Sequence, residues 1–114
     1  MKSNLDELIF RLSRHSTNCG YLYLKRAVEL VVDRGEFPRR RLTSGLYAQV
    51  AEDFGKTVSQ VSRSIGRAAE DIWNNGGGEV LSKLLHKPLP ERPTPGDLIY
   101  YIALIASGEK VRLL

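Results

Sequence analysis

The sequence is poor in the residues that disulfide-rich, redox and membrane proteins need. It contains one cysteine, one methionine and one tryptophan among 114 residues. A single cysteine, Cys19, cannot form an intramolecular disulfide, which predicts a reducing compartment such as the cytoplasm. No apolar run approaches the roughly 18 residues of a membrane span, and no basic segment leads a signal-peptide core. We therefore expect a cytoplasmic protein with no membrane partner.

Candidate catalytic and metal-binding groups are equally sparse. The soft ligands are His15, Cys19 and His86, and their spacing does not form a zinc set. The triplet Gly55–Thr57 resembles the end of a phosphate-binding loop, but that loop needs a glycine five residues earlier, where Val50 stands. We expect no metal, no cofactor and no enzyme activity.

Basic residues are concentrated in the middle of the chain. The formal net charge is +4 at pH 7, from 17 Lys and Arg against 13 Asp and Glu. Residues 34–67 contain seven basic and three acidic residues, which accounts for the whole excess. The seven are Arg34, Arg39, Arg40, Arg41, Lys56, Arg63 and Arg67. Such residues attract a polyanion if the fold gathers them on one face, and otherwise form an ordinary solvated surface.

The apolar pattern predicts one domain, residues 1–114, that is helical throughout. Six segments have apolar residues at helical spacing: 5–12, 20–34, 46–54, 57–73, 79–86 and 94–106. The last begins with a proline directly after Thr94, where proline is accepted at the first helical position. We expect loops over residues 37–44 and 74–78. No strand alternation is present, so the predicted fold class is all-α with about six short helices.

Two of these segments have the spacing of a helix-turn-helix. Gly55 and Lys56 join segment 46–54 to segment 57–73, and the glycine supplies the positive φ that such a turn needs. Ala51 lies four residues before the glycine, where a larger side chain would not fit between crossing helices. An ordinary α-hairpin can show the same spacing, so this pattern alone leaves both interpretations open.

The polar face of segment 57–73 is the surface that a DNA groove would meet. The first turns of a recognition helix enter the major groove and reach base edges. Arg63 is the best candidate reader, because a guanidinium can bond guanine O6 and N7 together. Gln60 can pair with adenine or form a capping box with Thr57, and Ser62 can contact a base, a phosphate or only water. We expect base contacts from Gln60, Ser62 and Arg63.

Phosphate contacts set affinity and salt dependence rather than sequence choice. Arg67 lies one turn beyond Arg63, and the run 39–41 is part of the predicted basic loop, which could equally be only solvated. The candidates for phosphate contact are Arg39, Arg40, Arg41, Lys56, Thr57, Ser59 and Arg67.

Several segments carry a resemblance to one family. The run Gly20–Leu24 (Gly-Tyr-Leu-Tyr-Leu), the run Leu46–Ala51, Phe54 and segment 57–73 closely resemble the C-terminal DNA-binding effector domain of the stage-zero sporulation response regulators of endospore-forming bacteria. The Pro93-Thr94 start of the last helix matches as well, and the similarity covers about residues 5–113. The resemblance implies a six-helix, winged-helix-like effector domain without clear strands. It also implies binding to short promoter boxes, often as tandem dimers.

The candidate reading residues depart from the pattern that the resemblance implies. The family has Arg, Glu and Arg at the positions of Gln60, Ser62 and Arg63, and His at the position of Arg67. Only Arg63 is retained, so we expect a different DNA target. The family's receiver domain precedes this one, but only about four residues precede the first predicted helix. We therefore do not expect receiver phosphorylation to switch this chain.

The resemblance further implies a contact with a sigma factor of RNA polymerase through the segment after the recognition helix. The matching stretch, 79–89, differs here by a glycine-rich entry and Pro88. Four of its apolar residues are equally compatible with the core: Val80, Leu81, Leu84 and Leu85.

Taken together, these features predict a double-stranded DNA-binding transcriptional regulator of the sporulation-initiation type that reads the major groove with segment 57–73. The alternative is a protein interaction module that dimerises with a full-length response regulator, or antagonises it, without binding specific DNA.

Overall fold

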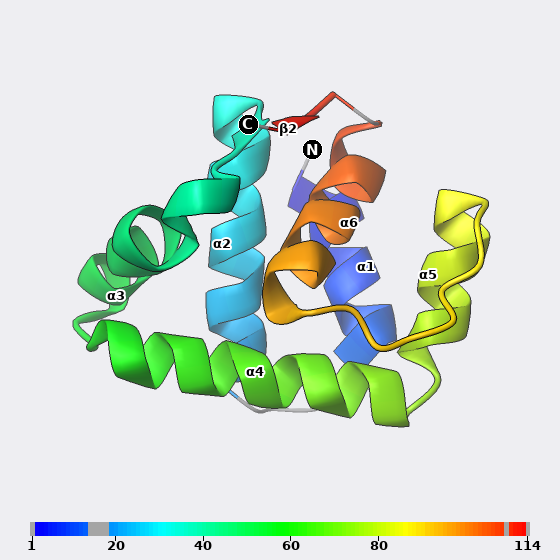
Figure 1. Ribbon diagram of the computed structural model, residues 1–114, viewed down its shortest axis with the longest axis horizontal. Coiled ribbons are helices and arrows are strands. Elements are labelled where there is room, and N and C mark those ends of the chain that lie inside the picture. Colours follow the sequence, from blue (N-terminus) through cyan, green and yellow to red (C-terminus); the bar gives the residue numbers. More distant parts are fainter. Residues whose placement is uncertain (1, 14–18, 109, 114) are drawn as a thin grey trace.

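The computed structural model describes the backbone of residues 2–13, 19–108 and 110–113, and their side chains except those of residues 2–4, 39 and 113. Six α-helices make up most of this part of the chain and pack around one apolar core (Figure 1). The helices are α1 (Lys2–Ser13), α2 (Gly20–Arg34), α3 (Ala48–Phe54), α4 (Val58–Asn74), α5 (Gly77–Leu85) and α6 (Pro95–Ser107). The predicted all-α fold is confirmed. None of the helices described is long and apolar enough to cross a membrane.

α2 is the central helix of the fold. It packs against α1, α3, α4 and α6, and its inner face, which includes Leu24, Val28 and Val31, is completely buried. The helix ends at Gly35, which adopts the left-handed conformation (φ 69°) expected of a glycine cap. In Figure 1, α4 lies across the first turn of α2 and runs along one edge of the molecule.

The segment between α2 and α3 is more regular than the loop predicted for residues 37–44. It consists of strand β1 (Glu36–Phe37), the 3₁₀ turn η1 (Arg39–Arg41) and the π-helical turn η2 (Leu42–Tyr47). β1 pairs in parallel with strand β2 (Arg112–Leu113). The prediction of a loop is wrong because Phe37 is buried in the core and its strand pairs with residues 112–113, a contact between distant parts of the chain that the local sequence does not reveal.

The glycine run 76–78 is also more structured than the predicted break over residues 74–78. α4 includes Asn74, and α5 starts at Gly77. A Cβ atom at Gly77 would lie 2.2 Å from Ile72 Cγ2, and one at Gly78 would lie 2.6 Å from the Trp73 ring. These two glycines therefore allow α5 to pack directly against the end of α4, and the break is limited to two residues.

α2 meets α4 at Gly20, the first residue of α2. A Cβ atom at this position would lie 2.2 Å from the carbonyl oxygen of Ser64 and 3.2 Å from the Cβ atom of Ala68. One residue later, the Tyr21 hydroxyl donates a hydrogen bond to the Asp71 carboxylate. The pKa of Tyr21 is raised well above its usual value, mainly by burial and further by this hydrogen bond. The two contacts fix the position at which α2 crosses α4.

Replacing Gly20 by alanine tests this crossing. The added methyl group overlaps the Ser64 carbonyl, so we expect the free energy of unfolding to fall by about 1 to 3 kcal/mol, the usual cost of overpacking. Urea denaturation measures the change. Gly66→Ala is the matched control, because Gly66 lies in α4 with no atom within 4 Å of an added Cβ. It should stabilise the protein by about 0.5 to 1 kcal/mol. Similar effects of the two substitutions would contradict the close approach.

Candidate nucleic-acid interface

α3 and α4 form the helix-turn-helix that the sequence predicts. α3 ends at Gly55, whose φ of 64° and ψ of 38° are left-handed, and the Gly55 N–H donates to the carbonyls of Ala51 and Glu52. Ala51 is buried, and Val61 and Ile65 of α4 are completely buried. The predicted role of the turn glycine is therefore confirmed, and Ala51 is buried as its predicted position between the helices requires.

A capping box between Thr57 and Gln60 fixes the first turn of α4. The Gln60 N–H donates to Thr57 Oγ1 (3.1 Å), and the Thr57 N–H donates to Gln60 Oε1 (2.9 Å). Thr57 is extended (φ −87°, ψ 157°), as an N-cap residue is. This confirms the capping role that the sequence left open for Gln60. The Gln60 amide nitrogen has no hydrogen-bond partner within the described part of the chain, so it remains available to a ligand.

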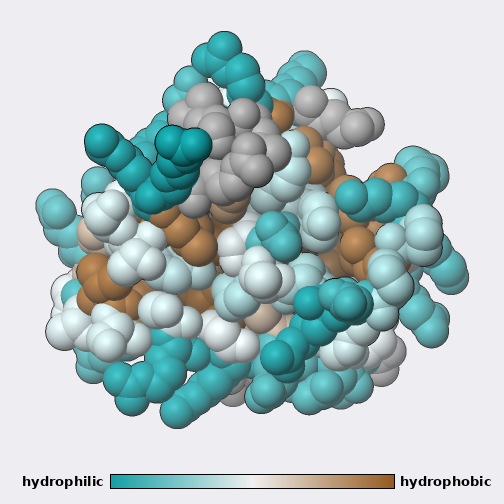
Figure 2. Space-filling model, in the orientation of Figure 1, coloured by the Kyte–Doolittle hydropathy of each residue, from teal (hydrophilic) through white to brown (hydrophobic). Residues whose placement is uncertain are grey.

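α4 has one buried and one exposed face. The buried face consists of Val61, Ile65, Ala68, Ala69 and Ile72. All the predicted contacts on this helix are exposed, namely Ser59, Gln60, Ser62, Arg63 and Arg67. Gln60, Arg63 and Arg67 are spaced i, i+3 and i+7, so they form one stripe. Ser62 is rotated from Arg63 by about 100° around the helix. Figure 2 shows hydrophilic residues along the edge of the molecule where α4 runs.

Three cations line a pocket between α4 and the start of α2, which we call the α2–α4 pocket. It has a volume of about 300 Å³. It is lined by Cys19 and Tyr23 on one side and by Lys56, Gln60, Arg63, Ser64 and Arg67 on the other. The structure thus brings four of the predicted contact residues together. Sequence reasoning missed Cys19 and Tyr23, because only the crossing at Gly20 places them beside α4.

The arginine run lies apart from this pocket, in η1. Arg40 and Arg41 are exposed, and neither forms an ion pair with any residue that the structure describes. The side chain of Arg39 lies outside the described part of the chain. Of the predicted phosphate contacts, Lys56 and Arg67 therefore line the α2–α4 pocket, and Arg40 and Arg41 lie before α3. Thr57 and Ser59 lie at the start of α4 and are not among the residues that line the pocket.

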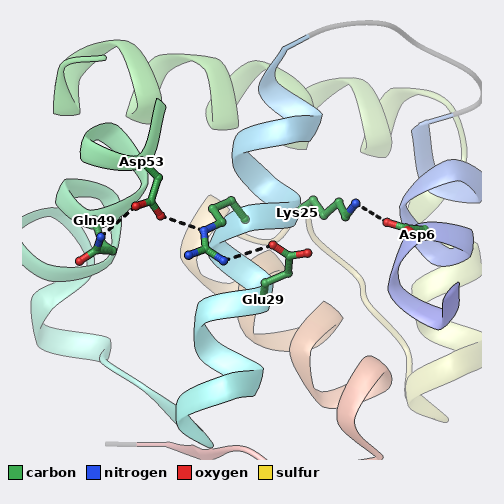
Figure 3. Close-up of polar contacts among 6 residues, drawn as sticks. Asp6, Lys25, Glu29, Gln49 and Asp53 are labelled. Atoms are coloured by element: carbon green, nitrogen blue, oxygen red, sulfur yellow. Dashed lines mark hydrogen bonds and ion pairs between the residues drawn. The ribbon is translucent and has the colours of Figure 1, made fainter. Parts of the chain in front are cut away.

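The acidic residue at the end of α3 is paired with a cation of α2. Arg26 Nε lies 2.8 Å from Asp53 Oδ2, and Gln49 Nε2 donates to Asp53 Oδ1 at 3.0 Å (Figure 3). These hydrogen bonds lower the pKa of Asp53, and the one from Arg26 has the larger effect. Arg26 therefore balances a negative charge that lies three residues before Lys56.

A second pair limits the positive charge at the other end of the exposed face. Glu70 lies three residues after Arg67, and its Oε2 is 3.3 Å from Arg92 Nη1. Both side chains are more than half exposed, so the pair contributes little to stability. Arg63 and Arg67 form no ion pair with the residues described. The unbalanced positive charge of α4 therefore lies before Glu70, at Arg63 and Arg67.

Cavities elsewhere on the described surface differ in charge. The pockets beside α5 include Glu79, and one between α1 and α6 includes Glu7. The described residues contain no group of three or more potential metal ligands, and His15 lies outside them. The α2–α4 pocket contains three cations and no carboxylate among its lining residues.

Comparison with protein families identifies the domain. The family model described as sporulation initiation factor Spo0A C terminal matches residues 5–105 of the 114. The chain belongs to this family. The match runs from α1 into the last turn of α6, so it contains the helix-turn-helix and every residue that lines the α2–α4 pocket. The Spo0A C-terminal family comprises DNA-binding regulatory domains of sporulation initiation and is not an enzyme family. The predicted resemblance is confirmed.

Removing the Arg26 side chain tests the charge balance at the end of α3. Arg26→Met deletes the main hydrogen bond that lowers the pKa of Asp53, so this pKa should rise toward its ordinary value of 3.8. A carboxylate with a lowered pKa stabilises the folded state above its unfolded-state pKa, and the contribution is lost as pH falls through the folded-state pKa. The wild type should therefore lose more stability than Arg26→Met as pH falls below about 4.

An NMR titration of the Asp53 carboxyl carbon measures the first effect, and urea unfolding at acidic pH measures the second. Lys25→Met is the control, because it deletes the ion pair between α2 and Asp6 instead. The account of Asp53 is contradicted if Arg26→Met and Lys25→Met give the same Asp53 titration curve.

Proposed function

We propose that this domain binds double-stranded DNA sequence-specifically, with the first turns of α4 in the major groove, and so regulates transcription in sporulation initiation. The observation that carries the proposal is the stripe Gln60, Arg63 and Arg67 on the exposed face of α4. It follows directly after a capped helix-turn-helix, and its two cations have no acidic partner among the described residues. Membership of a family of DNA-binding effector domains supports it.

Arg63 is the proposed base reader, because it lies at the centre of the exposed stripe and can bond guanine O6 and N7 in the major groove. Gln60 contributes its amide nitrogen to a base acceptor, since its side-chain oxygen already accepts the Thr57 N–H. Ser62 lies round the helix from Arg63 and contacts a neighbouring base. Gln60 and Ser62 differ from the residues that the family resemblance implies, so the target differs from the family's box.

The proposed phosphate contacts begin with the cations that have no acidic partner among the described residues. Lys56 in the turn and Arg67 one turn beyond Arg63 lie on either side of the reader, and Thr57 and Ser59 offer hydroxyl groups at the start of α4. The arginines of η1 (Arg39, Arg40 and Arg41) extend the same contacts before α3. Such contacts give affinity and orientation without sequence choice.

Further partners are proposed from the family resemblance. Two copies bind tandem sites, and the exposed side of α5 contacts a sigma factor. Leu81 is buried, and Val80, Leu84 and Leu85 pack against the core. Glu79 and Lys83 are therefore the side chains that α5 offers to such a partner. A DNA partner agrees with the cytoplasmic location predicted from the single cysteine.

Selection from a randomised duplex pool tests sequence-specific binding. The wild type should enrich one motif, and Arg63→Ala should weaken binding to that motif by about 1 to 3 kcal/mol and relax the preference at one base pair. Arg34→Ala is the matched control, because Arg34 is an exposed arginine at the far end of α2 from α4. It should leave both the motif and the affinity nearly unchanged. Binding without enrichment would instead favour the alternative of a protein interaction module.

The salt dependence of binding tests the phosphate contacts. Lys56→Ala should weaken binding to all duplex sequences alike and reduce the slope of log K against log salt by about 1, since one fewer counterion is released. Fluorescence anisotropy at several salt concentrations measures the slope for the selected motif and for an unrelated duplex. A loss limited to the selected motif would assign Lys56 to base reading instead.

A further inference from the structure

We infer that the α2–α4 pocket holds the phosphate backbone of one DNA strand, so that the start of α2 forms part of the DNA interface. The inference rests on the proposed DNA binding and extends it to residues outside the helix-turn-helix. Cys19 forms the α2 side of this site, and Lys56 and Arg67 form the α4 side.

The charge of the pocket points to an anionic ligand. Lys56, Arg63 and Arg67 line one cavity, yet none of the lining residues is acidic. Like charges that share a site repel one another, and a bound anion removes that repulsion. By contrast, Arg26 is paired with Asp53 and Arg92 with Glu70.

The neutral groups of the pocket are suited to the same ligand. The Ser64 hydroxyl and the Gln60 amide nitrogen can each donate a hydrogen bond to a phosphate oxygen. Burial, together with the nearby Cys19 thiol, raises the pKa of Tyr23. α2 begins beside the pocket, and the positive end of its dipole favours an anion there.

The position of the pocket fits a strand backbone, because its cations are spaced along α4 rather than gathered at one point. Gln60 and Arg67, which both line the pocket, are separated along α4 by about 10 Å of helix rise, so the cavity follows the helix over about two turns. Arg63 lies between them and can extend past the backbone to a base edge.

A pair of substitutions at Cys19 tests the inference. Cys19 is the N-cap residue of α2, it is exposed, and its side chain forms no capping hydrogen bond. Asp and Asn side chains have nearly the same size and shape, and the position is exposed, so Cys19→Asp and Cys19→Asn should fold with similar stability and differ mainly in charge. The aspartate places a negative charge against the phosphates. We therefore expect Cys19→Asp to bind DNA about tenfold more weakly than Cys19→Asn at low salt, with a smaller ratio at high salt.

The outcomes separate this inference from the proposed function. If Cys19→Asp and Cys19→Asn bind equally and the Arg63→Ala effect persists, the domain binds DNA but the pocket does not contact it, and the inference is overturned. If the wild type itself binds no duplex, both fail. Urea unfolding of the two variants verifies that their folds are equally stable.

Alkylation of the single cysteine distinguishes DNA phosphates from free phosphate. Duplex DNA should slow the reaction of Cys19 with iodoacetamide several-fold, because the strand covers the pocket. Inorganic phosphate, at the same total phosphate concentration, should leave the rate unchanged. Equal protection by inorganic phosphate would show that the pocket takes a free anion and would overturn its assignment to the DNA backbone.

Discussion

The approach of the α2 backbone to the α4 backbone at Gly20 is the contact on which the proposed interface depends. Because a Cβ at this position would lie 2.2 Å from the Ser64 carbonyl, any other residue would force the two helices apart. Tyr21 then bonds to Asp71 of α4, and the Tyr23 ring packs edge-on against Phe54 of α3, with 5.1 Å between the ring centroids. One end of α2 therefore positions both helices of the helix-turn-helix, and the same end forms a wall of the α2–α4 pocket.

This contact also gives a physical meaning to the Gly-Tyr-Leu-Tyr-Leu run that carries the family resemblance. The glycine permits the crossing, the two tyrosines anchor α4 and α3, and Leu24 is completely buried in the core. Leu22 is 57% exposed, and nothing in the structure explains why leucine stands there. Three of the five residues of this run thus position the helix-turn-helix, and a fourth belongs to the core.

The features that could be predicted from the sequence are those that depend on neighbours within about one helical turn. The Thr57–Gln60 capping box, the left-handed Gly55 and the exposed stripe on α4 all follow from spacing alone. The features that could not be predicted depend on residues far apart in the chain. Gly77 belongs to a glycine run that is typical of a flexible linker. In the structure, however, it packs so closely against Ile72 that no side chain would fit. The pairing of Arg26 with Asp53 and the approach of Cys19 to Arg67 likewise exist only after α2 has crossed the helix-turn-helix.

In the proposed interface, different residues contribute affinity and specificity. Lys56 and Arg67, the proposed phosphate contacts, offer charge to any duplex, and neither depends on the identity of the proposed base readers. Gln60 is restricted, because its side-chain oxygen is already used to cap α4, so a substitution there changes helix stability and base choice together. The Arg63 side chain takes no part in the capping box, so a substitution there changes base choice without this effect on helix capping. The proposed interface can therefore keep its general affinity for DNA while its preferred sequence changes, which is the combination expected of a family member that keeps one reader and replaces the others.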